Sequence, residues 1–341
     1  MQRCACAWPL GRRSFLAGAA ALGATGAQAD QAPHRIDVHH HIVPPTWFDA
    51  LRKAKLDNPP MSAWTPQRSI EDMDKAGTAT AMTSPTTPQV GFLPPADAAR
   101  VAREANEYAK RLMMDHPGRF GVFAMLPLPY VDESLKEVEY AFDTLQVDGI
   151  GMMTSYGDKW LGHPQFAPVF EELNRRKATV YTHPTSPNCC VNLVQGLSDA
   201  TIEWGADTTR SITSLIFSGA AQRYADIAFI FSHGGGVLTA VAERLQIQMV
   251  STPPYKGRFT REIVDDQLRR FYYDTAQVAN AVTIGALAKL VPVSQIVFGT
   301  DYPYRTGAEH VQGLVARFGA QELQAIDRDN ALRILPRLRT T

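Results

Sequence analysis

Short apolar segments alternate with longer amphipathic segments along most of the chain. The short ones predict buried strands of a parallel sheet, because runs of about four to eight apolar residues between turn residues are typical of them. We expect these strands at Ile36–Ile42, Thr78–Thr83, Phe120–Leu126, Gly149–Met153, Thr179–Thr182, Ile227–Ser232, Phe271–Asp274 and Gln295–Gly299. The longer segments predict helices, among them Ala96–Asp115, Asp132–Leu145, Phe166–Arg176, Ile212–Tyr224, Val237–Gln248 and Val278–Leu290.

This alternation predicts an α/β fold, a (β/α)8 or TIM barrel, because eight parallel strands with helices between them close into a barrel. No composition break divides residues 30–341, so we expect a single catalytic domain there. Three segments lack clear periodicity, Pro44–Pro66, Thr185–Ile202 and Ser251–Gly257. Each follows or lies near the C-terminal end of a predicted strand, where barrel enzymes build their sites, so we expect these loops to wall a substrate pocket.

Residues 1–29 are typical of a bacterial export signal. Arg12-Arg13 precede a short Gly/Ala-rich apolar segment, which ends in Ala27-Gln28-Ala29, a small-residue cleavage site. The pair of arginines resembles the twin-arginine type, which predicts a periplasmic enzyme. An uncleaved membrane anchor is the alternative, but residues 15–29 are shorter than the about 20 apolar residues of a span. We therefore expect no stable membrane span after cleavage.

Composition and charge limit the partners of the mature chain. Hydrophobic residues make up 45% of the sequence, and Lys+Arg and Asp+Glu are balanced at 34 each. Neither nucleic acid nor an anionic membrane surface is favoured as a partner. Cys189 and Cys190 are adjacent, a spacing that rarely reaches disulfide geometry, so we expect no disulfide framework and no cysteine zinc site. No glycine-rich dinucleotide motif occurs, and no organic cofactor is expected.

The first predicted strand ends in three histidines. Because strand side chains alternate between faces, His39 and His41 share one face and His40 points away from it. Two imidazoles at this spacing can reach the same metal ion. A histidine-rich surface turn, or His40 as a ligand on its own, is the alternative.

Three further strand ends carry groups of the same kind. His183 follows the fifth predicted strand, His233 the sixth and Asp301 the eighth. Barrel active sites lie at the C-terminal ends of the strands, so these side chains are expected to gather at one mouth. Their coincidence with the histidine pair predicts a metal site there.

At these motifs the sequence resembles the amidohydrolase superfamily, and within it the decarboxylases related to aminocarboxymuconate semialdehyde decarboxylase. The matching segments are Asp37-Val-His39-x-His41, Thr182-His183-Pro184, Ser232-His233-Gly-Gly-Gly236 and Gly299-Thr300-Asp301-Tyr302-Pro303. The segment from Thr154 to Gly162 is most similar to the 6-methylsalicylate decarboxylase branch. The resemblance implies a barrel of the metal-dependent hydrolase type.

The resemblance also implies roles for these residues. His39, His41, His183 and Asp301 would bind one divalent metal ion, usually Zn2+, with Mn2+ as the alternative, and His233 would remain unligated and move a proton. Either His233 or Asp301 could deliver the proton. Binuclear relatives use a lysine at the end of the fourth strand, and Gly149–Thr154 contains none, so a single metal ion is expected. The predicted oligomer is a homodimer or homotetramer.

The implied reaction is the non-oxidative decarboxylation of a small aromatic carboxylate of the 2-hydroxybenzoate or 6-methylsalicylate type. In relatives an arginine at the spacing of Arg244 reaches the substrate across a dimer interface, although a surface charge is an equal interpretation. A second arginine of those relatives has no counterpart before Trp64, which favours a monocarboxylate. Aromatic lining is expected from Trp64, Tyr156, Trp160 and Tyr302, whereas Phe217 is expected in the core.

Two other functions remain open from the residues alone. The same site could hydrolyse a lactone or amide, with His233 activating metal-bound water. A binding protein that had lost catalysis would be expected to lack a ligand or the base, and all five residues are present.

Overall fold

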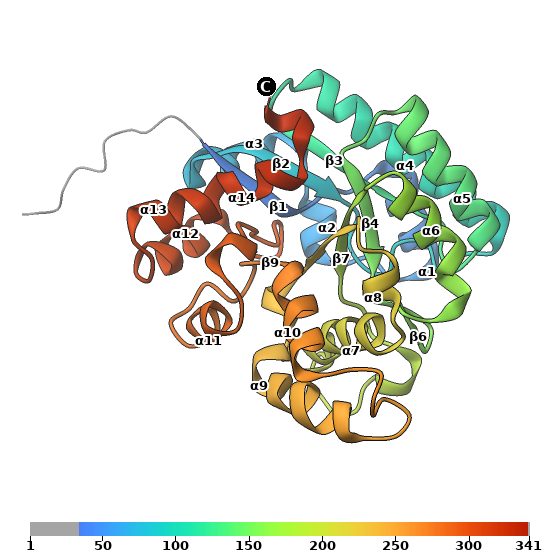
Figure 1. Cartoon of the computed structure of the whole chain (residues 1–341). Coiled ribbons are helices and arrows are strands. Elements are labelled where there is room, and N and C mark those ends of the chain that lie inside the picture. Colours follow the sequence, from blue (N-terminus) through green and yellow to red (C-terminus); the bar gives the residue numbers. More distant parts are fainter. Residues whose placement is uncertain (1–33, 340–341) are drawn as a thin grey trace, which may run out of the picture. The chain divides into compact units, whose positions relative to one another are not determined.

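The computed structural model describes residues 34–339, which fold as an α/β barrel with parallel strands (Figure 1). The strands follow each other around the barrel in the order β1 (Arg35–His41), β2 (Thr78–Ser84), β3 (Phe120–Met125), β4 (Gly149–Met153), β7 (Thr179–His183), β8 (Ala228–Phe231), β9 (Tyr272–Asp274) and β10 (Ile296–Val297). Backbone bonds from Val38 N–H to Phe298 O and from His41 N–H to Tyr302 O join the last strand to the first. The chain after β4 adds a short antiparallel hairpin of β5 (Ser155–Tyr156) and β6 (Lys159–Trp160).

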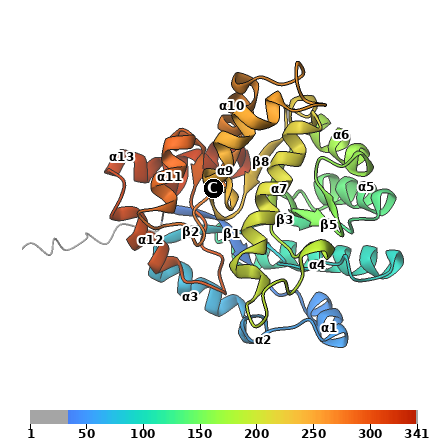
Figure 2. The same ribbon diagram turned by 90° about the horizontal axis from the view of Figure 1, so that it is seen from below.

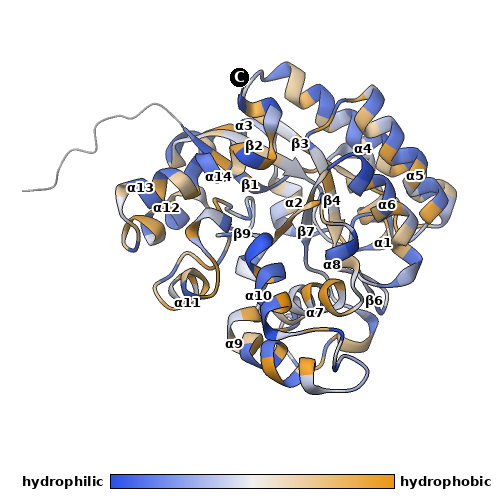
Figure 3. Cartoon of the chain, viewed as in Figure 1, coloured by the Kyte–Doolittle hydropathy of each residue, from blue (hydrophilic) through white to orange (hydrophobic). Residues whose placement is uncertain are grey.

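Helices surround these strands, as the turned view in Figure 2 shows. They are α1 (Pro45–Ala54), α2 (Pro59–Ala63), α3 (Pro66–Ala76), α4 (Pro95–Asp115), α5 (Val131–Glu139), α6 (Ala167–Arg175), α7 (Glu203–Phe217), α8 (Ala220–Arg223), α9 (Leu238–Glu243), α10 (Arg261–Arg270), α11 (Thr283–Leu290), α12 (Gly307–Val315), α13 (Ala320–Gln324) and α14 (Asn330–Ile334). In α4 the buried residues include Ala98, Val101, Ala105 and Ala109, at the spacing of one helical face. Figure 3 shows hydrophobic and hydrophilic residues interleaved along α4 and α5, as expected for helices with one side on the sheet.

The predicted barrel is confirmed. Each of the predicted strands is present, and its ends lie within two residues of the expected positions. Phe217 is buried against Tyr255 and Phe259, so its predicted place in the core is also confirmed.

The prediction of a loop at Pro44–Pro66 is wrong, because α1 and α2 occupy most of this segment. Trp47 and Leu51 lie one turn apart in α1 and are both fully buried, but prolines and polar residues around them hide the pattern. Pro45 takes the first position of the helix, where a missing N–H costs nothing.

Several helix boundaries also differ from the prediction. The segment predicted from Ile212 begins earlier, at Glu203, and is divided by Gly219, whose φ of +82° interrupts the helix. The helix predicted from Val278 begins at Thr283. The segment predicted at Val237–Gln248 continues beyond α9 as a π-helical turn, η6 (Arg244–Met249).

The expectation that Cys189 and Cys190 would not reach disulfide geometry is wrong as well. Cys189 and Cys190 are joined to each other as a disulfide, within the 3-10 turn η3 (Asn188–Cys190). Sequence separation alone did not reveal the bond, which depends on the local conformation of this turn. The predicted export signal lies outside the described residues. Among the helices of residues 34–339, none has the length and apolar character needed to cross a membrane.

An apolar cluster fills the barrel below its mouth. It consists of Ile36, Val38, Met82, Phe123, Tyr181, Ile230 and Val297, together with Ala331, Leu335 and Leu338 from the C-terminal segment. The C-terminal segment is tied to the start of β7 by a hydrogen bond from Thr179 Oγ1 to Ile334 O of 2.6 Å. Within residues 34–339 the C-terminal segment thus packs over the N-terminal ends of the strands.

Candidate metal centre

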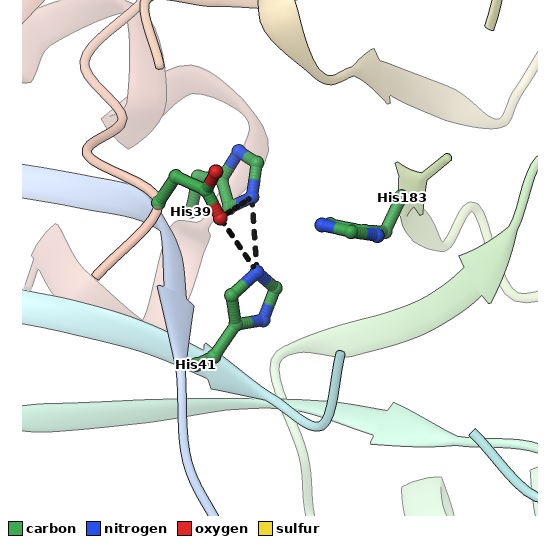
Figure 4. Close-up of side chains that lie close together, drawn as sticks. His39, His41 and His183 are labelled. Atoms are coloured by element: carbon green, nitrogen blue, oxygen red, sulfur yellow. Dashed lines mark hydrogen bonds and ion pairs between the residues drawn. The ribbon is translucent and has the colours of Figure 1, made fainter. Parts of the chain in front are cut away.

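Four buried side chains converge at the C-terminal mouth of the barrel. His39 and His41 come from β1, His183 ends β7 and Asp301 follows β10. One nitrogen or oxygen of each lies within 4.8 Å of the corresponding atoms of the others. Figure 4 shows the rings of His39, His41 and His183 pointing toward a common centre from two sides. The structure therefore brings together all the residues predicted as metal ligands.

An irregularity in β1 places its two histidines in the mouth. Ile36 and Val38 pack in the apolar cluster inside the barrel, yet His39 and His41 also face the interior. Strict alternation would turn these two pairs to opposite faces. The pairing with β2 shifts register between Asp37 and His40, and such a bulge changes which side chains point inward. His40 points out of the site and stacks on Tyr302, as the alternation from His39 to His41 predicts.

The hydrogen bonds of these histidines fix which nitrogen faces the centre. Nδ1 of His39 bonds Asp274 Oδ2 at 2.7 Å, Nδ1 of His41 bonds Ser84 O at 3.2 Å and Nδ1 of His183 bonds Pro184 O at 2.8 Å. Carbonyl and carboxylate oxygens only accept, so we assign a proton to each Nδ1. Each ring therefore turns Nε2 toward the shared centre, as metal-binding histidines do when the other nitrogen is hydrogen-bonded.

The charges at the centre favour a cation. Burial opposes a charge on His39, but Asp274 and Asp301 outweigh it and raise the pKa of His39 to about 10. Burial lowers the pKa of His41 and of His183, so both rings are neutral. The pKa of Asp301 lies well below its ordinary value, because the attraction of the charged His39 ring and its hydrogen bond outweigh the opposing effect of burial.

The donor set fits a divalent ion. Nε2 of His39 lies 3.1 Å from Nε2 of His41 and 3.2 Å from Asp301 Oδ1, and His41 Nε2 lies 3.1 Å from the same oxygen. Two carboxylates, those of Asp301 and Asp274, surround one protonated ring, which leaves a net negative charge. Three imidazole nitrogens and one carboxylate oxygen are donors that suit zinc and similar ions.

His233 stands beside this set. Its Nδ1 bonds Ala276 O at 3.1 Å, so the proton lies on Nδ1 and Nε2 is left for the site. The ring centre lies 5.0 Å from that of His39 and 6.0 Å from that of His183. Its side chain is half-buried, and burial lowers its pKa. A neutral imidazole with one unbonded nitrogen can both take and return a proton.

A glycine turn presents His233 to the site. His233 itself adopts a left-handed φ of +53°, and glycines follow it. A Cβ at Gly236 would lie 2.0 Å from Gly205 O, so the chain can pass helix α7 only without a side chain there. Non-glycine residues with such a φ are strained, and this strain is found preferentially at functional sites.

Asp274 was missed as a site residue by the sequence analysis. Its carboxylate accepts hydrogen bonds from the ring of His39 and from the backbone N–H of His233, the latter at 2.8 Å. Gly299 makes room for this arrangement, because a Cβ there would lie 2.9 Å from His39 Cβ and 3.0 Å from Asp274 Cβ. The signal was available, since Asp274 ends a predicted strand and His183 directly follows one. His39, His233 and Asp274 also form a second potential metal set among the described residues, but it shares His39 with the first.

The predicted substrate-binding aromatic residues lie in different places. Trp64 is buried and donates from Nε1 to Ser69 Oγ at 3.0 Å, while Tyr302 stacks on His40 at 4.7 Å. Trp160 donates to the buried carboxylate of Asp207 at 2.6 Å. These contacts tie surrounding elements to each other, and the structure does not bring these three side chains to the four predicted ligands.

Besides Tyr181 of the apolar cluster, two aromatic residues that were not predicted as site residues contact the ligands. The ring of Trp204 in α7 lies 5.7 Å from that of His183, and the ring of Tyr304 lies 6.0 Å from that of His41. Burial raises the pKa of Tyr304 to about 12, so its hydroxyl remains protonated. Tyr304 follows Asp301 by three residues and could have been found from that spacing.

Tyr156 lines a cavity of about 460 Å³ at the same mouth. The cavity lies over β2, β3, β4 and β7, and its wall includes Phe92, Met153, Thr185 and Lys159. Met153 pairs with His183 in neighbouring strands, but none of the four predicted ligands lines the cavity. Arg244 is exposed on η6 and is not brought to the site within the described chain.

Comparison with known proteins gives a consistent result. The amidohydrolase family profile matches residues 36–337. The 6-methylsalicylic acid decarboxylase of Aspergillus aculeatus is 34% identical over 324 residues, which cover 89% of this chain and 97% of that protein. A crystal structure of an amidohydrolase II has a TM-score of 0.81 at 26% identity and covers 89% of this chain and 99% of that one. The dihydroxybenzoic acid decarboxylase of Polaromonas sp. JS666, solved with manganese and 2-nitroresorcinol, has a TM-score of 0.77 at 19% identity, with 89% and 97% covered.

Proposed function

The chain belongs to the amidohydrolase family and is a metal-dependent carboxy-lyase of aromatic acids, and we propose that its substrates are 2-hydroxybenzoates of the 6-methylsalicylate type. One observation carries this proposal. His233 presents an unbonded Nε2 beside a set of three imidazoles and one carboxylate, so a proton carrier and a cation site face the same space. The relatives reported above that carry a functional name are decarboxylases, and the hydrolase alternative is therefore not favoured.

The cation site would position the substrate. His39, His41, His183 and Asp301 would hold the ion. When bound, the ion would attract the carboxylate and neighbouring hydroxyl of a 2-hydroxybenzoate and offset their negative charge.

His233 then acts on the ring. Its Nε2 first takes a proton from solvent and then gives it to the ring carbon that carries the carboxylate, which interrupts the aromatic system. The bond from this carbon to the carboxylate breaks, its electron pair restores aromaticity, and CO2 leaves. His233 is left neutral and takes a proton from solvent for the next turnover, which its half-buried position permits. Asp301 is the alternative donor, because its carboxylate faces the same space.

The substrate ring is placed by nearby aromatic and apolar groups. We assign this role to Trp204 and Tyr304, which lie against two of the histidines. The adjoining cavity, with Tyr156 in its wall, has room for the substituents of the ring.

Several finer features belong to the same proposal. Zn2+ is proposed because imidazole nitrogens dominate the donor set, with Mn2+ as the alternative. Export by a twin-arginine signal with cleavage after Ala29 is proposed from the sequence of residues 1–29, and a homodimer is proposed from the family. Metal analysis of the purified chain, N-terminal sequencing of a periplasmic fraction and light scattering test these points separately.

The experiment for the reaction follows both products. The metal-loaded chain is incubated in D2O with 6-methylsalicylate and, separately, with aromatic lactones, while CO2 and the ring product are measured. We expect CO2 and 3-methylphenol in equal amounts, with one deuterium at the carbon that lost the carboxylate. Hydrolysis of a lactone without release of CO2 from any salicylate would overturn the proposal.

A further inference from the structure

Gln277 contacts the one carboxylate of the ligand set. Its Nε2 donates a hydrogen bond to Oδ2 of Asp301. The other oxygen, Oδ1, faces the Nε2 atoms of His39 and His41. The two oxygens of Asp301 therefore have different partners, an amide donor on one side and the cation position on the other.

The backbone of Gln277 is held in an unusual conformation. Its φ is +58°, in the left-handed region that non-glycine residues rarely adopt. Its N–H donates to Nε2 of His310 at 2.9 Å, and Nδ1 of the same ring bonds Thr306 O at 2.8 Å. His310 is buried, so one imidazole links the start of α12 to Gln277. A strained residue that neighbouring groups hold in place is a sign of a functional constraint.

His233 and Asp301 share this conformation, with φ values of +53° and +65°. All three residues follow neighbouring strands of the barrel, β8, β9 and β10, at the mouth. The left-handed turn after each strand directs a side chain into the same region. Gln277 thus lies between His233 and Asp301 at the mouth and has the same left-handed backbone conformation after its strand.

We propose that Gln277 is a positioning residue for Asp301, which fixes the plane of the carboxylate so that Oδ1 alone is presented to the metal ion. A carboxylate without this partner could rotate and offer both oxygens. Outer partners of this kind orient metal ligands, and their loss typically weakens metal binding by about 10- to 100-fold. The proposal rests on the role of Asp301 as a ligand in the proposed function.

The test measures metal binding and needs no substrate. Gln277→Leu removes the donor at nearly constant size, and Gln277→Glu replaces it with an acceptor. Zn2+ affinity is determined on each metal-free chain by competition with a chromogenic chelator. We expect both variants to bind Zn2+ about 10- to 100-fold more weakly than the unchanged chain.

A second readout reports the coordination itself. The visible absorption spectrum of the Co2+-loaded chain depends on the number of ligand atoms, so it should change in Gln277→Leu when the carboxylate of Asp301 is free to offer both oxygens. Gln324→Leu is the matched control, because Gln324 also donates to a carboxylate, that of Asp329 at 3.2 Å, but on the exposed surface. This control should leave affinity, spectrum and the melting temperature of the metal-free chain unchanged.

The outcomes distinguish a failure of the positioning role of Gln277 from a failure of its premise, that Asp301 is a metal ligand. Gln277→Leu with unchanged affinity and spectrum overturns the inference, and so does Gln277→Glu with affinity equal to that of the unchanged chain. If Asp301→Asn binds Zn2+ as tightly as the unchanged chain, the premise fails instead. Loss of Zn2+ in Asp301→Asn together with weakened binding in both Gln277 variants supports the positioning role.

Discussion

The two ends of the barrel use the same strands for opposite purposes. On β1, Ile36 and Val38 join the apolar cluster, whereas His39 and His41, a few residues later, face the metal position. On β7 the change occurs within two residues, from Tyr181 in the cluster to His183 in the ligand set. The N-terminal end is filled and closed by the C-terminal segment, and the C-terminal end is buried but polar.

This difference indicates that stability depends mainly on the apolar end of the barrel and function on the polar end. The apolar end is stabilised by burial and packing alone. Burial contributes about 25 cal/mol per Å² of apolar surface removed from water. The polar end contains buried ionised groups that are costly unless they are paired or bind a metal ion. We therefore expect changes at one end to affect stability and changes at the other to affect metal content and turnover.

The largest effect is expected from a ligand. His183→Ala removes one of three imidazoles from the centre, and the remaining donors should no longer retain an ion through purification. Decarboxylation should fall to background, and metal analysis should show far less than one ion per chain. A variant that stays fully loaded and active would remove His183 from the ligand set.

His233→Ala should separate proton transfer from metal binding at the same end. The loss of a positioned acid typically lowers turnover by about 10²- to 10⁴-fold. Because its ring lies beside the ligand set and not within it, the metal content should match that of the unchanged chain. Parallel assays of kcat and bound metal test this separation. If His233→Ala were purified without metal, His233 would have to be counted as a ligand.

At the apolar end the opposite pattern is expected. Phe123 is fully buried and stacks on Tyr181 at 5.5 Å, so Phe123→Ala should lower the free energy of unfolding by about 3–5 kcal/mol. The refolded variant should still bind one metal ion. Val282→Ala is the control, because Val282 is 81% exposed and its loss should change stability by less than about 0.5 kcal/mol. Denaturant unfolding and metal analysis are carried out on both variants. If Phe123→Ala lost its metal ion with unchanged stability, the assignment of stability to the apolar end and metal binding to the polar end would be wrong.

The apolar end and the ligand residues could be predicted from the sequence because each depends on a local pattern. Buried strands appear as short apolar runs, and His183 and Asp301 lie just after two of the predicted strands. The α1 segment was missed because its burial rests on two residues, Trp47 and Leu51, within a proline-rich stretch.

The partners of the ligands could not be predicted in the same way. The bond from Asp274 to His39 joins residues 235 positions apart, and the contact of Trp204 with His183 depends on the path of the long loop before α7. Such contacts depend on tertiary packing, which alternation and spacing do not encode. The bulge in β1 could not be predicted for the same reason, because it is visible only in the pairing of β1 with β2.

The smallest effect concerns the proton that a metal ion must displace. In the metal-free chain the pKa of His39 is raised to about 10, so its Nε2 is protonated at neutral pH and an ion competes with that proton. Apparent affinity for Zn2+ should therefore increase by about tenfold per pH unit between about pH 7 and 8, with release of one proton per ion. Asp274→Asn removes a negative charge from His39 and should flatten this dependence, because the pKa of His39 then falls. Calorimetric titrations in two buffers of different ionisation enthalpy measure the protons released, and a value near zero for the unchanged chain would contradict the charge assignment at the polar end.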